Sequence, residues 1–227
     1  MRSPLSLKDQ SVALLLVDLQ EEQRRDPQYK ASGIDQILGN AARLLEAARA
    51  TRRLVVHAAY LRDFTKRPPR PFEPTSSDGR PTFSDISSPM TAICREVAPE
   101  DGEHVIYKND ASAFCEGDLA PLLKQHGIDW LVVSGVWTEA CVAATVRDAM
   151  AAGLRVLLVK DACGSGTQAM HKTAVLNLAN RLYGGAVTDT ARAVNLMKGE
   201  EAQVWIAERP VPILFNFTDA AQLYDEL

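Results

Sequence analysis

The sequence lacks any apolar run approaching the roughly 20 residues that a membrane-spanning helix needs. Its first residues lead into an apolar stretch that ends at Asp18, without the long apolar core and small-residue cleavage site of a signal peptide. It also lacks an excess of positive charge, because the formal net charge is −4. We therefore expect a cytoplasmic protein with no nucleic acid and no membrane as partner.

Cysteine is scarce as well. The four cysteines are Cys94, Cys115, Cys141 and Cys163, and no two of them have CxxC spacing. The absence of CxxC spacing excludes a zinc ribbon and a thioredoxin motif. In a cytoplasmic protein each is expected to be a free thiol, so one of them could serve as a nucleophile. The context of each cysteine decides which.

What the chain does have is a regular alternation of apolar and amphipathic segments. Six short apolar runs predict strands, at about 11–17, 54–61, 104–107, 130–134, 154–159 and 186–188. Helical patterns lie between them, at about 34–50, 89–97, 117–125, 139–152 and 168–182. Continuous apolar strands separated by helices predict an α/β fold, a doubly wound, mostly parallel six-stranded sheet with helices on both faces.

The end of the chain is set apart by its composition. Residues 1–198 hold the alternating pattern and are predicted to form one domain, with 199–227 as a C-terminal extension. Within the extension, Val204–Phe217 is more apolar than a free terminus should be. We expect it to pack on the domain or on a neighbouring subunit, and we expect a homodimer or homotetramer.

Two charged residues follow predicted strands. In an open α/β sheet the ligand site lies at the carboxyl ends of the strands. Asp18 stands there after the first strand, where partial burial would raise its pKa and suit it to act as a general base, although an aspartate that caps a turn would look the same. Lys108 follows the third strand and could favour a nearby thiolate, although alone it resembles an exposed loop lysine.

Cys141 has the context of a nucleophile. A strand, a turn at Gly135 and then the first turn of a helix lead to it. The N-terminus of a helix lowers the pKa of a thiol and offers free N–H groups to an oxyanion. The other three cysteines lack this combination and are interpreted as small buried apolar side chains.

Three segments in this order resemble the isochorismatase-like cysteine hydrolases. They read Asp18-Leu19-Gln20, then Lys108 followed by Ser112-Ala113-Phe114, then Gly135 to Thr145 with Cys141 inside it. The resemblance extends from about Ser11 to Ala193. Within the superfamily it points to the branch of N-carbamoylsarcosine amidase and of the ureidoacrylate and biuret amidohydrolases.

The resemblance implies a role for each residue. Cys141 would be the nucleophile, Asp18 would take its proton and later activate water, and Lys108 would stabilise the thiolate. The peptide bond before Trp137 would be cis, and the Trp137 and Cys141 N–H groups would form an oxyanion hole. The reaction implied is hydrolysis of the C–N bond of a small amide, carbamoyl or ureido compound through a thioester.

Two departures from the family pattern bear on substrate and metal. Gln23 stands where family members often have an aromatic residue. The nicotinamidase branch carries a D-x-H metal motif after the second strand, whereas the corresponding stretch here, His57–Asp63, contains none. We therefore predict no catalytic metal and no cofactor.

Two other functions and one other catalytic arrangement compete with this one. An isochorismatase-type vinyl ether hydrolase needs no cysteine nucleophile, which the presence of Cys141 disfavours. A non-catalytic flavodoxin-like binding module would require Asp18, Lys108 and Cys141 to coincide by chance. A Cys–His pair would need one of the four histidines beside Cys141, but His57 is better explained as a core residue.

The substrate-binding residues are less constrained by the sequence. Five prolines between Arg62 and Pro81 indicate a long ordered loop, which is as often a plain connection as a functional one. Its arginines would suit an anionic amide or ureido acid, although a solvated loop of mixed charge explains them too. The candidates that we single out are Gln20, Gln23, Phe64, Arg67, Phe72 and Glu139.

Overall fold

A single eight-stranded sheet organises the computed structural model, which describes residues 2–227. The strands are β1 (Arg2–Ser6), β2 (Val12–Val17), β3 (Leu54–Tyr60), β4 (His104–Lys108), β5 (Trp130–Val136), β6 (Arg155–Gly164), β7 (Ala186–Thr188) and β8 (Glu201–Trp205). Their order across the sheet is β1-β8-β7-β6-β5-β2-β3-β4. The strands from β2 to β7 are parallel, which confirms the predicted α/β class.

The predicted number of six strands is wrong, because β1 and β8 were missed. These two strands pair antiparallel with each other, and β8 pairs antiparallel with β7. Residues of β1 alternate between exposed and half-buried, and the strand contains Pro4, which a sheet tolerates at its edge. An edge strand of this kind has no continuous apolar run, so its sequence does not resemble the buried strands.

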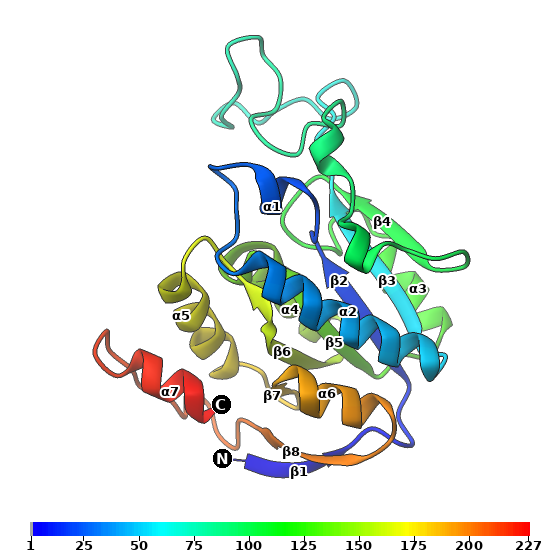
Figure 1. Ribbon diagram of the computed structural model, residues 1–227, viewed down its shortest axis with the longest axis vertical. Helices are drawn as coiled ribbons and strands as arrows, with labels where there is room; N and C mark the ends of the chain where they lie inside the picture. The colour runs from blue at the N-terminus through cyan, green and yellow to red at the C-terminus, as the bar shows by residue number, and fades with distance from the viewer. Residues whose placement is uncertain (1) are drawn as a thin grey trace.

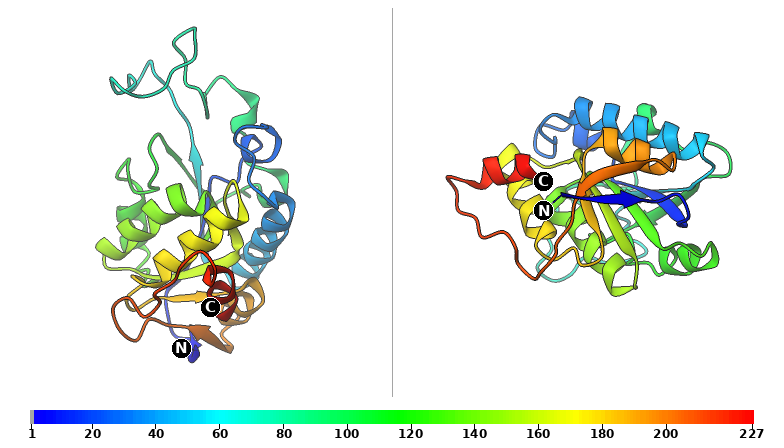
Figure 2. Two further views of the ribbon diagram at one scale, coloured as in Figure 1. Left: turned by 90° about the vertical axis from the view of Figure 1, so that its left-hand side faces the viewer. Right: turned by 90° about the horizontal axis from the view of Figure 1, so that it is seen from below.

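Helices cover both faces of the sheet, as Figure 2 shows. The helices are α1 (Glu22–Arg25), α2 (Ile34–Ala50), α3 (Leu119–Gln125), α4 (Ala143–Ala151), α5 (Gln168–Ala179), α6 (Thr190–Met197) and α7 (Ala220–Glu226). Apolar residues of α2 and α6 pack on one face, and those of α3, α4, α5 and α7 pack on the other. The helix expected over 89–97 consists instead of two short 3₁₀ turns, Pro89–Thr91 and Arg95–Val97. No helix within residues 2–227 is both long and apolar enough to span a bilayer.

The predicted long loop follows β3 and extends beyond the carboxyl end of the parallel strands, at the top of Figure 1. Part of it returns to the sheet, since the backbone of Arg62 bonds to that of Ser84 at 2.7 Å. The last residues of the chain lie at the other end of the molecule, where β8 joins the sheet and α7 packs against α5. The division of the chain at residue 198 stays a prediction.

Candidate active site

Neighbouring strands bring Asp18 and Lys108 together. Asp18 directly follows β2, and Lys108 is the last residue of β4, with β3 between the two strands. The chain turns sharply at Asp18, whose φ of 52° lies in the left-handed region. Its N–H donates to the Ala58 carbonyl of β3 at 2.8 Å, which holds the turn at the end of the sheet.

The two side chains form a buried ion pair. Lys108 Nζ lies 2.9 Å from Asp18 Oδ2, and the residues are 0% and 4% exposed. This confirms the expected proximity of the carboxylate and the ammonium. Lys108 Nζ also donates to the Asp110 carbonyl at 3.0 Å and lies 4.1 Å from the centre of the Tyr60 ring. Such a pair is retained only where its charges compensate each other, because each alone would be costly to bury.

Cys141 reaches the same place from β5. The helix expected to begin near Glu139 is made of two pieces, a π-helical turn over Thr138–Val142 and then α4. Cys141 lies in the π-helical turn. The peptide bond between Val136 and Trp137 is cis, as the resemblance implies. Within residues 2–227 no hydrogen bond is formed by the Trp137 N–H, which therefore remains available as a donor.

Gly135 allows the backbone of β5 to lie close to that of β2 at Val17. Its φ is +136°, and a Cβ atom there would lie 2.1 Å from the Val17 carbonyl oxygen. Only glycine permits both the backbone conformation and the close contact. The residue before Asp18 and the turn before Cys141 are thereby held side by side.

The pKa values of the three groups are linked. Burial raises the pKa of the Asp18 carboxyl, and the Lys108 ammonium opposes this rise. Burial, followed by the Asp18 charge, raises the pKa of the Cys141 thiol, whereas Lys108 lowers it. Burial disfavours the Lys108 ammonium, but Asp18 and Cys141 outweigh it and raise the pKa of Lys108. These directions favour the neutral thiol form of Cys141 beside the salt bridge of Asp18 and Lys108.

A buried histidine supports the turn that carries Cys141. Thr138 Oγ1 donates to the Gly164 carbonyl at 2.9 Å and lies 2.8 Å from His171 Nδ1. His171 Nε2 lies 3.0 Å from the Tyr224 hydroxyl of α7. Burial lowers the pKa of His171 to about 4, so the ring is neutral at pH 7 and connects the turn to the C-terminal helix. His171 therefore has a structural place in the fold.

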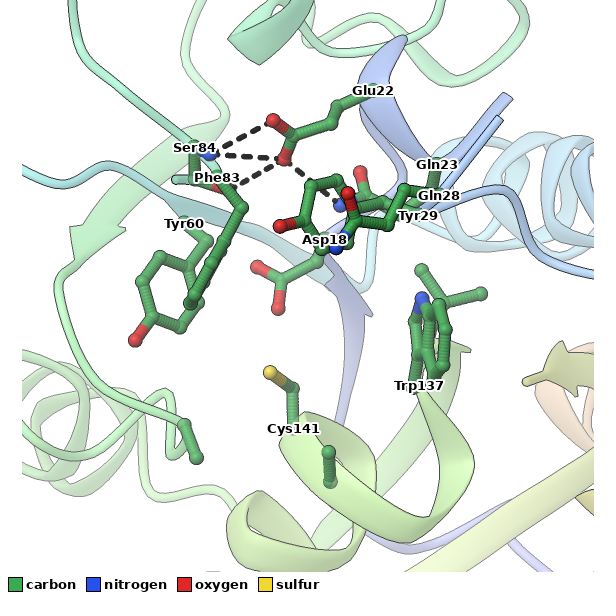
Figure 3. Close-up of a pocket in the computed structure, with 13 residues that line it drawn as sticks. Asp18, Glu22, Gln23, Gln28, Tyr29, Tyr60, Phe83, Ser84, Trp137 and Cys141 are labelled. Carbon is green, nitrogen blue, oxygen red and sulfur yellow. Dashed lines mark hydrogen bonds between the residues drawn. The ribbon is translucent and has the colours of Figure 1, made fainter. Parts of the chain in front are cut away.

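A cavity of about 420 Å³ opens above these groups (Figure 3). Cys141 and Asp18 line it, and Trp137 forms one side. The rings of Tyr60 and Phe83 form another, with their centroids 5.4 Å apart. Within the described chain no histidine lines this cavity, which leaves a Cys–His pair without a structural basis. The cavity can hold a small molecule against the Cys141 sulfur.

Of the residues predicted to bind substrate, one lines the cavity. Gln23 does so, in α1. Gln20 is buried elsewhere, because its amide bonds to the backbone of Tyr60 and Thr91 and ties β3 to the following loop. The other four lie outside the lining: Phe64 contacts Arg62, Arg67 pairs with Glu116, Phe72 is 83% exposed, and Glu139 accepts from Ser165.

Several lining residues were missed by the sequence analysis: Glu22, Gln28, Tyr29, Tyr60, Phe83, Ser84 and Ala111. Glu22 and Tyr29 lie close after Asp18, so their nearness in the chain was a usable signal. Phe83 and Ser84 come from the long loop, and no local pattern indicates that it folds back there. Instead, the return depends on Glu22, which accepts hydrogen bonds from the Ser84 N–H at 2.8 Å and from its hydroxyl at 2.8 Å.

The other motif residues join the site to the core. Ala113 N–H donates to Thr145 Oγ1 at 3.0 Å, which connects the loop after Lys108 to α4. Within residues 2–227 no group of three or more His, Cys, Asp or Glu side chains is arranged to hold a metal ion.

Comparison with known proteins identifies the family. The Isochorismatase domain model matches residues 12–192. Maleamate amidohydrolase of Pseudomonas putida KT2440 is 33% identical over 78% of this chain and 82% of its own length. N-carbamoylsarcosine amidase of an Arthrobacter species is 30% identical over 71% of this chain and 62% of its own. An isochorismatase structure from Pseudomonas putida KT2440 is 28% identical and superposes with a TM-score of 0.68, covering 83% of this chain and 92% of that one.

The fold and the family match together define a hydrolase of the α/β class. The chain belongs to the isochorismatase family, and its relatives include amidohydrolases.

Proposed function

We propose that this protein is a cysteine-dependent amidohydrolase that cleaves the C–N bond of a small amide, carbamoyl or ureido compound. One observation carries the proposal. The Cys141 thiol, the Asp18 carboxylate and the Lys108 ammonium meet at the end of a cavity that can hold a small molecule. The amidohydrolase relatives support the same reaction class.

The charges explain how a thiol with a raised pKa could react. Lys108 supplies one positive charge. The site holds one negative charge, which is on Asp18 before the reaction begins. Transfer of the Cys141 proton to Asp18 moves that negative charge to sulfur and leaves the net charge unchanged. A buried site therefore gains no uncompensated charge during activation, which is the cost that usually prevents such a transfer.

The thiolate then attacks the carbonyl carbon of the substrate. The tetrahedral oxyanion accepts hydrogen bonds from the Trp137 and Cys141 N–H groups, and Asp18 returns its proton to the leaving nitrogen. Ammonia or an amine departs and leaves an acyl group on Cys141. Asp18 next takes a proton from water, whose oxygen attacks the thioester, and the acid product leaves as the thiol re-forms.

An ammonia-release screen over small amides, carbamoyl amino acids and ureides tests the proposal. With the best compound, Cys141→Ala should lower turnover by at least about 10³-fold, because the nucleophile is lost. Cys115→Ala is the matched control, since Cys115 lies outside the cavity lining and should tolerate the change. Retention of more than about a tenth of wild-type turnover by Cys141→Ala would show the mechanism to be wrong.

The same screen distinguishes an amidohydrolase from a vinyl ether hydrolase. Hydrolysis of a vinyl ether yields a carbonyl compound and an alcohol without ammonia, and it would survive replacement of Cys141. A protein that acts in that way would release no ammonia in the screen, and its activity would not fall in Cys141→Ala.

A further inference from the structure

The cavity contains a second carboxylate that the proposed reaction does not use. Glu22 lines the cavity and is 5% exposed. Figure 3 shows it at the opposite end from Cys141, with Asp18 between them. Its hydrogen-bond partners are all donors: the N–H and the hydroxyl of Ser84, and the side-chain amide nitrogen of Gln23 at 3.4 Å. A carboxylate that only accepts hydrogen bonds carries a negative charge into the cavity.

Among residues 2–227, no lysine, arginine or histidine forms an ion pair with Glu22. The described residues that line the cavity include no lysine or arginine. Arg25, in the same helix, is exposed and lies outside the cavity lining, and two other nearby arginines already have carboxylate partners. Arg24, in the same helix, pairs with Asp35 and Glu96, and Arg62, whose backbone bonds to Ser84, pairs with Glu73. Since Lys108 and Asp18 compensate each other, the cavity retains the charge of Glu22.

A second acceptor, beside Glu22, has no hydrogen-bond donor. Gln23 lines the cavity and is 7% exposed, and its Oε1 atom has no hydrogen-bond partner within residues 2–227. A buried polar atom without a partner is costly unless a bound molecule supplies one. The end of the cavity away from Cys141 therefore holds a carboxylate and, beside it, an amide oxygen without a donor.

Aromatic rings complete this environment. Tyr29 and Phe83 have ring centroids 5.7 Å apart, and Phe83 in turn packs against Tyr60, so that the three rings form one wall. Aromatic faces attract cations as well as apolar groups. An organic cation would thus meet a negative charge, a free carbonyl oxygen and aromatic faces in one place.

We propose that the substrate carries a cationic ammonium or guanidinium group, which Glu22 and Gln23 bind while the amide carbonyl lies at Cys141. This deepens the proposed function and rests on it only for the position of the amide. It differs from the anionic substrate expected from the arginines of the long loop. Arg67, the arginine singled out there, lies outside the cavity and pairs with Glu116.

A series of three amides of matched length tests the charge preference. δ-Aminovaleramide carries an ammonium group at the far end, hexanamide a methyl group and glutaric acid monoamide a carboxylate. Binding is measured by calorimetry on the Cys141→Ala protein, which cannot turn the compounds over. Since a hydrogen bond to a charged group corresponds to about a 10- to 100-fold change in affinity, δ-aminovaleramide should bind about 10- to 100-fold more tightly than hexanamide. Glutaric acid monoamide should bind most weakly.

Glu22→Gln, in the same background, assigns the preference to one residue. It should bring the affinity for δ-aminovaleramide to within about threefold of that for hexanamide, whose own affinity should not change. Glu46→Gln on the exposed side of α2 is the control, because it removes the same charge far from the cavity. The three-compound comparison needs no substitution at Glu22, so it decides the question even if Glu22→Gln does not fold.

Three results would overturn the inference: tighter binding of glutaric acid monoamide, no measurable binding of δ-aminovaleramide, or a preference that survives in Glu22→Gln. Ammonia release from the same compounds by the protein with Cys141 intact is a separate measurement. Release without a preference for the cation contradicts the inference and leaves the proposed function standing. Tighter binding of the cation without release of ammonia from any of the three compounds supports the inference and counts against the proposed function.

Discussion

Replacement of Lys108 by methionine is the most informative test of the buried ion pair. Methionine keeps the length and apolar stem of the side chain but removes the ammonium that lies 2.9 Å from Asp18. The Asp18 carboxylate would then be buried without a counterion, and its Oδ1 atom already lacks a partner within residues 2–227. Loss of one member of a buried pair costs about 3–5 kcal/mol. This is a large part of the roughly 5–15 kcal/mol that stabilises a typical protein.

The assay is urea denaturation followed by tryptophan fluorescence. At neutral pH, Lys108→Met should lower the free energy of unfolding by about 3–5 kcal/mol. The double variant Asp18→Asn/Lys108→Met should recover most of the loss, because neither charge remains. Lys124→Met on the exposed surface of α3 is the control and should change the free energy of unfolding by less than about 0.5 kcal/mol.

The loss in free energy of unfolding caused by Lys108→Met should also depend on pH. The direction of this dependence follows from the burial of Asp18. Burial raises the pKa of Asp18 in the folded protein, and loss of Lys108 removes the charge that opposes this rise. A carboxyl whose folded pKa exceeds its unfolded value stabilises the fold below the unfolded pKa, and that contribution is lost as pH rises through the folded pKa. The difference from wild type should therefore narrow as pH falls. A loss below about 1 kcal/mol, or losses that add in the double variant, would refute the idea that the pair is coupled.

Three further predictions follow from the fold and the sequence. Gly135→Ala should lower the free energy of unfolding, measured by urea denaturation, by at least about 3 kcal/mol, because the new Cβ would lie 2.1 Å from the Val17 carbonyl oxygen. Gly39→Ala on α2 is the control. Its Cβ would meet nothing within 4 Å, so this change should be neutral or stabilising. Activity should survive exhaustive dialysis against EDTA, since the chain has no D-x-H motif after β3; a loss that Zn²⁺ restores would contradict this. Light scattering should detect a homo-oligomer at micromolar concentration, because Leu214 and Phe217 in the extension are 84% and 100% exposed; a monomer would count against it.

The parallel strands and the three groups at their ends could be predicted because both leave local signals. The continuous apolar runs of β2, β5 and β6 correspond to strands that are buried along most of their length. In a parallel sheet the residues that follow such runs must meet at one edge. Asp18 and Cys141 were found for this reason, and Lys108 at the end of β4 was found with the help of the family pattern.

The rest of the site depends on contacts between distant parts of the chain. Phe83 reaches the cavity because Ser84 bonds to Glu22, 62 residues earlier, and no periodicity reports such a contact. Phe72 and Arg67 belong to the same loop and were expected at the cavity, but that part of the loop extends into solvent. A sequence indicates that a long loop exists more readily than it indicates which of its residues return to the sheet.

The central claim is that Cys141 carries the acyl group of the substrate during turnover. The most direct measurement is mass spectrometry of the protein quenched with acid while it hydrolyses an amide found in the ammonia screen. The mechanism predicts a mass increase equal to that of the acyl group, located on the peptide that contains Cys141 and abolished by Cys141→Ala. An acyl group on another residue, or full turnover in the protein with Cys141→Ala, would contradict it.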